Sequence, residues 1–130
     1  MEFRKIFDTI PEQFDKYRPR YSKELFDSLS CSGTQVYYSK NDIRSEKLAT
    51  VIRENTQTYL QKNNTRQIKR AGSEIYVLDR CTVPAVLVEC GFLSNPAELE
   101  QLKTEEYQKK LGCVIALSVL DFTAAGSNNN

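Results

Sequence analysis

The clearest strand pattern in the sequence is the run Ala85-Val86-Leu87-Val88-Glu89-Cys90. Pro84 precedes this run and Gly91 ends it, and both residue types commonly bound strands. Because apolar and polar residues do not alternate, we expect a strand buried on both faces, as in a parallel sheet covered by helices. Glu89 would then be partly buried near the carboxyl end of the sheet, where open α/β folds place their sites.

The segments before this strand predict two further strands and a helix. Thr34–Tyr38 and Ile75–Leu78 are rich in β-branched and aromatic residues, which favour strands. Between them, a helical repeat begins at Ser45 and ends near Asn63-Asn64, followed by a basic loop from Thr65 to Gly72. The expected buried stripe of this helix consists of Leu48, Val51, Ile52, Asn55 and Tyr59.

Two more helices are expected after the strand. Asn95, Pro96 and Glu98 have the spacing of a helix start with an N-cap, a first-turn proline and a capping-box glutamate. Thr104 begins the last helix, whose apolar stripe is Tyr107, Leu111, Val114, Ile115 and Phe122. The fold class is therefore α/β: a partial, open, twisted sheet of about three strands packed by helices.

Composition restricts the chemistry. The 130 residues include no histidine, which excludes Ser-His-Asp and Cys-His catalysis as well as imidazole metal ligands. The net charge of +1 does not indicate nucleic-acid binding. Residues 40–70 nevertheless carry eight basic and three acidic side chains. This segment either contacts an anionic polymer or solvates a helix face and a loop.

The cysteine spacing and the N-terminal segment indicate in which cellular compartment the chain is expected. No C-x-x-C pair is present, so a zinc knuckle is not expected, and Cys90 and Cys113 lie in apolar runs typical of a core. The N-terminus MEFRKIFDTI has no apolar signal region, and no transmembrane segment is evident. As it stands, the chain is expected in the cytoplasm.

Glu89 is the main candidate for chemistry. A carboxylate in this position can act as a general base. Alternatively, it hydrogen-bonds the neighbouring helix N-terminus near Asn95 and has only a structural role. Spacing alone leaves both interpretations open.

The run from Pro84 to Glu98, PAVLVECGFLSNPAE, resembles the C-terminal motif of the zinc-dependent N-acetylmuramoyl-L-alanine amidases. The resemblance extends from about residue 32 to residue 122 and includes Gly33–Tyr38, the helix from Ser45 and Asn64-Thr65-Arg66. These enzymes cleave the amide between muramic acid and the stem peptide of peptidoglycan in the cell envelope.

By this resemblance Glu89 corresponds to the catalytic glutamate, which assists a zinc-activated water. Arg66 matches a recurrent family position, either as a substrate contact or as an anchor of its loop. The family holds zinc with two histidines and a glutamate in the first half of the domain, and those segments are absent here. No cofactor is therefore expected, and the chain alone is expected to be inactive. The alternative function is a non-catalytic module that binds peptidoglycan or another anion through Lys62–Arg70, with Arg66 and Lys69 as candidates.

Three parts of the chain are distinguished: a helical segment at 1–31, the amidase-like part at 32–123 and a disordered tail at 124–130. Residues 1–30 resemble the opening of class I S-adenosylmethionine-dependent methyltransferases, but the glycine-rich cofactor loop does not follow. The change from one resemblance to the other is compatible with a gene fusion, a deletion remnant or a mis-assembled gene. Because half of the sheet would be missing, self-association through exposed sheet edges is expected.

Overall fold

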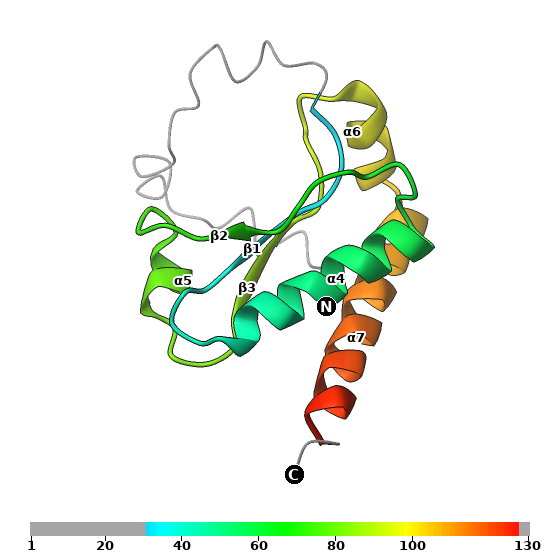
Figure 1. Cartoon of the computed structure of the whole chain (residues 1–130). Helices are drawn as coiled ribbons and strands as arrows, with labels where there is room; N and C mark the ends of the chain where they lie inside the picture. Colours follow the sequence, from blue (N-terminus) through cyan, green and yellow to red (C-terminus); the bar gives the residue numbers. More distant parts are fainter. Residues whose placement is uncertain (1–30, 128–130) are drawn as a thin grey trace, which may run out of the picture.

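The computed structural model describes residues 31–127. Seven elements follow one another: β1 (Gln35–Tyr38), α4 (Arg44–Tyr59), β2 (Lys69–Arg70), α5 (Tyr76–Arg80), β3 (Val86–Glu89), α6 (Pro96–Leu102) and α7 (Glu105–Ser127). They form an open three-stranded sheet with helices (Figure 1), which confirms the predicted α/β class. Of the helical segment expected at residues 1–31, residues 1–30 lie outside the described residues. None of the helices between residues 31 and 127 is both long and apolar enough to cross a membrane.

The sheet has the order β2-β1-β3, with β1 in the centre. β1 runs parallel to β2 and antiparallel to β3. The antiparallel register places Gln35 opposite Glu89 and Tyr38 opposite Val86. The expectation that the strand around Val88 pairs as in a parallel sheet is therefore wrong, because its described partner β1 runs antiparallel to it.

The core lies on one face of the sheet. Val36 of β1 packs against Leu48, Ala49 and Ile52 of α4, and Val86 and Val88 of β3 contact the same cluster. α7 packs along α4, and Phe122 of α7 contacts the same cluster, so both helices lie on this side of the core (Figure 1). Since side chains alternate along a strand, Leu87 and Glu89 point to the opposite face, and both are exposed. The expected burial of this strand on both faces is wrong.

The buried stripe of α4 differs in part from the expected one. Leu48 and Ile52 are buried as predicted, but Tyr59 is 63% exposed and Thr56 is only 1% exposed. The remaining buried residues are Ser45 and Ala49. Small side chains fit where the helix packs closely on the sheet and on α7, so packing, not apolarity alone, selects the buried face.

Three local predictions need correction. Ile75–Leu78 is not a strand: Tyr76–Arg80 forms the short helix α5, in which the amides of Leu78 and Asp79 donate to the Ile75 carbonyl. β2 lies within the stretch expected to be a loop. α7 continues to Ser127, so the first residues of the expected disordered tail are helical.

We predict that Ile52→Ala lowers the free energy of unfolding by about 2–5 kcal/mol, because it leaves a cavity between α4 and the sheet. Ile52 is 1% exposed. The control is Ile43→Ala, since Ile43 is 89% exposed and its loss is expected to cost less than about 0.5 kcal/mol. Urea denaturation followed by circular dichroism measures both, and equal midpoints for the two variants would contradict this packing.

Candidate functional site

Glu89 occupies the last position of β3 and is exposed on the open face of the sheet. Its nearest cross-strand neighbour is Gln35, because directly opposed residues of antiparallel strands share a face. Between residues 31 and 127, no hydrogen bond or ion pair engages the Glu89 carboxylate. The structural alternative, a bond to the helix start at Asn95, is therefore not formed, and partial burial of Glu89 was a wrong expectation. The carboxylate is accessible to solvent and to a ligand.

Arg66 lies beside Gln35 and is held by three contacts. Its Nε donates to the Ser32 carbonyl over 2.7 Å and its Nη1 donates to Gln35 Oε1 over 3.2 Å. The guanidinium also stacks on Phe92, 4.3 Å from the ring centroid. No ion pair joins Arg66 to Glu89. These contacts favour Arg66 as an anchor that joins its loop to the start of β1 and to the segment after β3.

Glu98 on α6 fixes the chain on both sides of the site. Its Oε1 accepts from the Gly33 amide over 2.6 Å and its Oε2 accepts from the Phe92 amide over 2.8 Å. Asn95 caps α6 as predicted, accepting from the amides of Ala97 and Glu98. Glu98 does not complete a capping box with Asn95. Its carboxylate instead holds the segment that follows Glu89 against the segment that enters β1.

A second polar cluster anchors the start of β1. Gly33 has φ +90°, and an added Cβ would lie 2.6 Å from Asn64 Oδ1, so only glycine fits here. The Asn64 side chain donates to the Thr34 carbonyl, and Gln61 donates to both the Thr34 and the Tyr107 hydroxyl. α7 and the loop after α4 thereby set the position of Gln35 and, across the strand pair, that of Glu89.

The other candidate residue, Lys69, lies on β2. It is exposed, and its ammonium is 5.9 Å from the centre of the Tyr37 ring. The structure therefore brings Arg66 close to the Glu89 end of the sheet, while Lys69 is paired in register with Tyr37, farther along β1.

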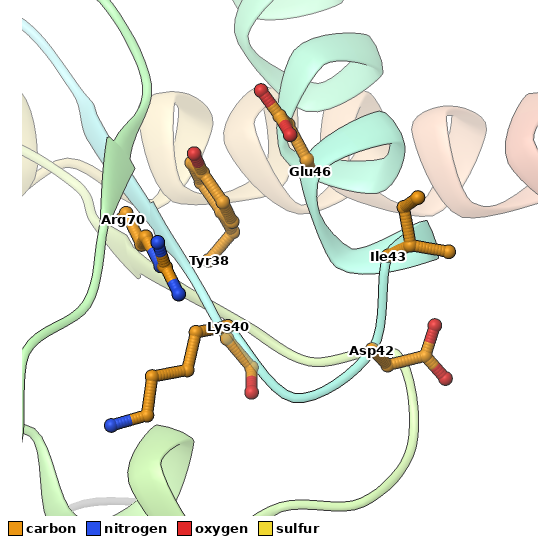
Figure 2. A pocket seen from close by; sticks show the side chains of 7 residues that line it. Tyr38, Lys40, Asp42, Ile43, Glu46 and Arg70 are labelled. Atoms are coloured by element: carbon orange, nitrogen blue, oxygen red, sulfur yellow. The ribbon is translucent and has the colours of Figure 1, made fainter.

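A separate hollow of about 290 Å³ opens at the far end of β1. Tyr38 and Arg70 project into it from neighbouring strands and Glu46 projects from α4 (Figure 2). Its other lining residues are Ser39, Lys40, Asp42 and Ile43. The hollow is lined by charges of both signs. It lies away from Glu89, because Glu89 is opposite Gln35 at the start of β1, whereas the hollow is at the Tyr38 end.

Two of these charges are already paired with neighbours. Lys40 forms an ion pair with Asp79 over 2.7 Å, and the hydrogen bond with Lys40 lowers the pKa of Asp79. The side-chain hydrogen bond from Arg44 likewise holds the pKa of Asp42 below its usual value. The hollow therefore offers Arg70 and Glu46 as its remaining charged groups, with no arrangement typical of catalysis.

The donor set does not fit a protein-bound transition metal. The sequence has no histidine, and in the described part of the chain no three Cys, Asp or Glu side chains converge as metal ligands. Glu89 is thus a single carboxylate, supported by the Arg66 and Glu98 contacts around it.

Comparison with known proteins identifies the family. A sequence model of the N-acetylmuramoyl-L-alanine amidases matches residues 25–121, so the chain belongs to this family. The match begins before residue 32, where the amidase-like part was expected to start. The germination-specific N-acetylmuramoyl-L-alanine amidase of Bacillus subtilis is 36% identical over 95 residues, which are 73% of this chain and 39% of that relative.

Solved amidases share the fold. The CwlD amidase of Clostridioides difficile, solved in complex with the GerS lipoprotein, has a TM-score of 0.69 and 34% identity, over 72% of this chain and 47% of its own. An N-acetylmuramoyl-L-alanine amidase from Nostoc punctiforme has a TM-score of 0.64 and 25% identity, over 74% of this chain and 51% of its own. The chain thus spans about half or less of the relatives that it matches.

Sequence reasoning located Glu89 but did not assign Gln35 or the two bonds that the Glu98 carboxylate accepts, one of them over 65 positions. Glu98 was noticed only as a local capping residue, and its partner Gly33 is 65 positions away. The available signals in the sequence were the polar Gln35 at the start of a predicted strand and Gly33 shortly before it. Neither signal specifies a partner, because that depends on how α6 packs.

We predict that Glu98→Ala lowers the free energy of unfolding by about 1–3 kcal/mol, since it removes the acceptor for two amides. Glu100→Ala is the control, because the exposed Glu100 bonds only the exposed Lys103 and its loss should cost about 0.5 kcal/mol or less. Urea titration at pH 7 compares the two. A loss at Glu98 no larger than that at Glu100 would contradict the bridging role.

We also predict different reactivities for the cysteines that were both expected in the core. Cys90 is half-buried, and burial raises the pKa of its thiol, whereas Cys113 is exposed, which corrects that expectation. Less Cys90 is thiolate at a given pH, so iodoacetamide at pH 8 should alkylate Cys113 severalfold faster. Peptide mass spectrometry over time measures both rates, and faster reaction at Cys90 would show that the strand end opens.

Proposed function

We propose that this chain carries the general-base part of an N-acetylmuramoyl-L-alanine amidase, with Glu89 as its catalytic residue. The observation that supports this most directly is the exposed carboxylate at the end of β3, which has no partner among residues 31–127 and lies within the residues that match the family. In this role Glu89 takes a proton from the water that attacks the amide between N-acetylmuramic acid and L-alanine. Arg66 and Glu98 hold the backbone around it.

The zinc dependence implied by the family resemblance has no counterpart among the described side chains, and the sequence has no histidine. We propose that residues outside 31–127 must supply the ligands for a metal, and that the chain alone does not hydrolyse peptidoglycan. A solvated carboxylate by itself cannot replace the several kcal/mol that a Lewis acid contributes to such a reaction. The cytoplasmic location stays a prediction. The methyltransferase resemblance of residues 1–30 supports no proposed methyl transfer, because no glycine-rich loop follows it.

A chimera tests the role of Glu89. Residues 25–121 replace the matched segment of the Bacillus subtilis germination-specific amidase, and release of stem peptides from purified peptidoglycan is measured. We expect hydrolysis by the chimera and a fall of about 10²–10⁴-fold in kcat for Glu89→Gln, because the substitution removes the base and keeps the shape of the side chain.

The control for this chimera is Glu100→Gln, an exposed carboxylate on the same polypeptide whose partner is Lys103. It should leave kcat unchanged. Equal activity of the Glu89→Gln and Glu100→Gln chimeras would exclude Glu89 as the base.

Anion binding through the basic segment is the second candidate function. The exposed side chains of Lys69 and Arg70 on β2 favour it, because neither forms an ion pair within residues 31–127. Arg66 supports it less, since internal contacts already hold its guanidinium. Retention on insoluble peptidoglycan at low salt, lost on changing Lys69 and Arg70 to Ala, would favour this function over the first.

A further inference from the structure

The hollow at the Tyr38 end of β1 contains three polar groups that have no partner in the part of the chain that the structure describes. They are the guanidinium of Arg70, the carboxylate of Glu46 and the hydroxyl of Tyr38. The remaining charges of its wall belong to ion pairs with neighbouring residues. One cation, one anion and one hydroxyl group are therefore left for a ligand.

The three side chains come from different elements whose backbones are held together (Figure 2). Tyr38 of β1 is paired in register with Arg70 of β2. Glu46 lies in the first turn of α4. Ser45 in the same turn is fully buried, and its hydroxyl accepts from the Ala85 amide over 3.0 Å, which joins this turn to the segment before β3. The backbone around the hollow is therefore preformed, which lowers the entropic cost of binding a ligand.

The two free charges determine the class of ligand. Arg70 and Glu46 do not form an ion pair with each other, so each is available to a group of opposite charge. Glu46 would repel a simple anion bound to Arg70, and Arg70 would repel a simple cation bound to Glu46. A zwitterion satisfies both residues. Its carboxylate can accept two parallel hydrogen bonds from the guanidinium, and its ammonium can face the carboxylate of Glu46.

The volume of the hollow indicates a small ligand. Pockets for drug-sized ligands commonly have volumes of about 300–1,000 Å³. The hollow has about 290 Å³, which suits a molecule of the size of a small amino acid. Ile43 also lines the hollow and is 89% exposed, so it offers an apolar surface to a short side chain.

We propose that the hollow binds a free α-amino acid, with its carboxylate on Arg70 and its ammonium on Glu46. The hydroxyl of Tyr38 can donate a further hydrogen bond to the carboxylate. Because these charges are exposed to solvent, the complex is weak and its dissociation constant lies in the millimolar range at low salt. The site does not include Glu89, so it does not rest on the proposed amidase function.

Binding of an anionic polymer is the competing interpretation of Arg70. In that case Glu46 opposes binding by repulsion, and neutralising it strengthens the interaction. An amino acid instead loses the partner of its ammonium when Glu46 is neutralised. The sign of the effect of Glu46→Gln therefore distinguishes the two interpretations.

A titration of the isotope-labelled 130-residue chain with L-alanine at pH 7, followed by nuclear magnetic resonance, tests the proposal. We expect saturable shifts of the amide signals of Tyr38, Glu46 and Arg70. N-acetyl-L-alanine lacks the ammonium and L-alanine amide lacks the carboxylate. Each analogue should bind about threefold more weakly than L-alanine, or weaker still, because one of two charge contacts is lost.

Two charge-neutralising variants test the two halves of the site. Arg70→Gln and Glu46→Gln should each weaken L-alanine binding about three- to tenfold. Lys47→Gln and Glu54→Gln are the matched controls, because both residues are exposed on α4 and neither lines the hollow. These controls should change binding by less than about twofold. The amide spectrum of each variant verifies that its fold is retained.

Saturable binding of L-alanine that both analogues and both variants weaken supports the site. Equal binding of N-acetyl-L-alanine and L-alanine would show a simple anion site and overturn the proposal, as would tighter L-alanine binding by Glu46→Gln. Shifts that do not saturate, or that occur away from the hollow, would also overturn it. None of these results bears on hydrolysis by the chimera that carries Glu89, so the two proposals succeed or fail separately.

Discussion

The antiparallel pairing of β1 with β3 is the constraint on which the arrangement of this domain depends. β1 is the central strand, so its register with β3 determines which residues of both strands face α4 and which face the open side. A shift of β3 by one residue against β1 would turn Val88 out of the core and Glu89 into it. The packing of Val88 against Val36 and Ile52 therefore fixes the exposure of Glu89, so packing on one face of the sheet determines which side chains the other face presents.

Polar contacts over long sequence separations keep this register at the Glu89 end. Glu98 joins the amides of Gly33 and Phe92, and Arg66 joins Ser32 to Gln35 and Phe92. Each contact replaces hydration of a backbone group or a charge with a bond of defined direction. Since the Glu89 carboxylate itself is left without a partner within residues 31–127, these contacts position a carboxylate that they do not neutralise.

The sequence predicted the α/β class, β1, β3 and the helices α4, α6 and α7, because their patterns are strong over several residues. It placed Glu89 at a strand end correctly. It failed at Ile75–Leu78, where β-branched and apolar residues form a short helix with only Leu78 buried. It also predicted a parallel sheet buried on both faces from a run without alternation. The direction of a neighbouring strand, and whether a layer covers the second face, depend on distant parts of the chain. The same limit applies to the roles of Glu98 and Gln35.

The central claim is that the chain carries the glutamate end of an amidase domain without a metal site of its own. Equilibrium dialysis of the purified 130-residue chain against Zn²⁺ at pH 7, with zinc measured by atomic absorption, tests it most directly. The account predicts no stoichiometric zinc, since the sequence has no histidine and no described cluster of Cys, Asp and Glu converges. One tightly held zinc ion per chain, lost on changing Glu89 to Gln, would contradict it.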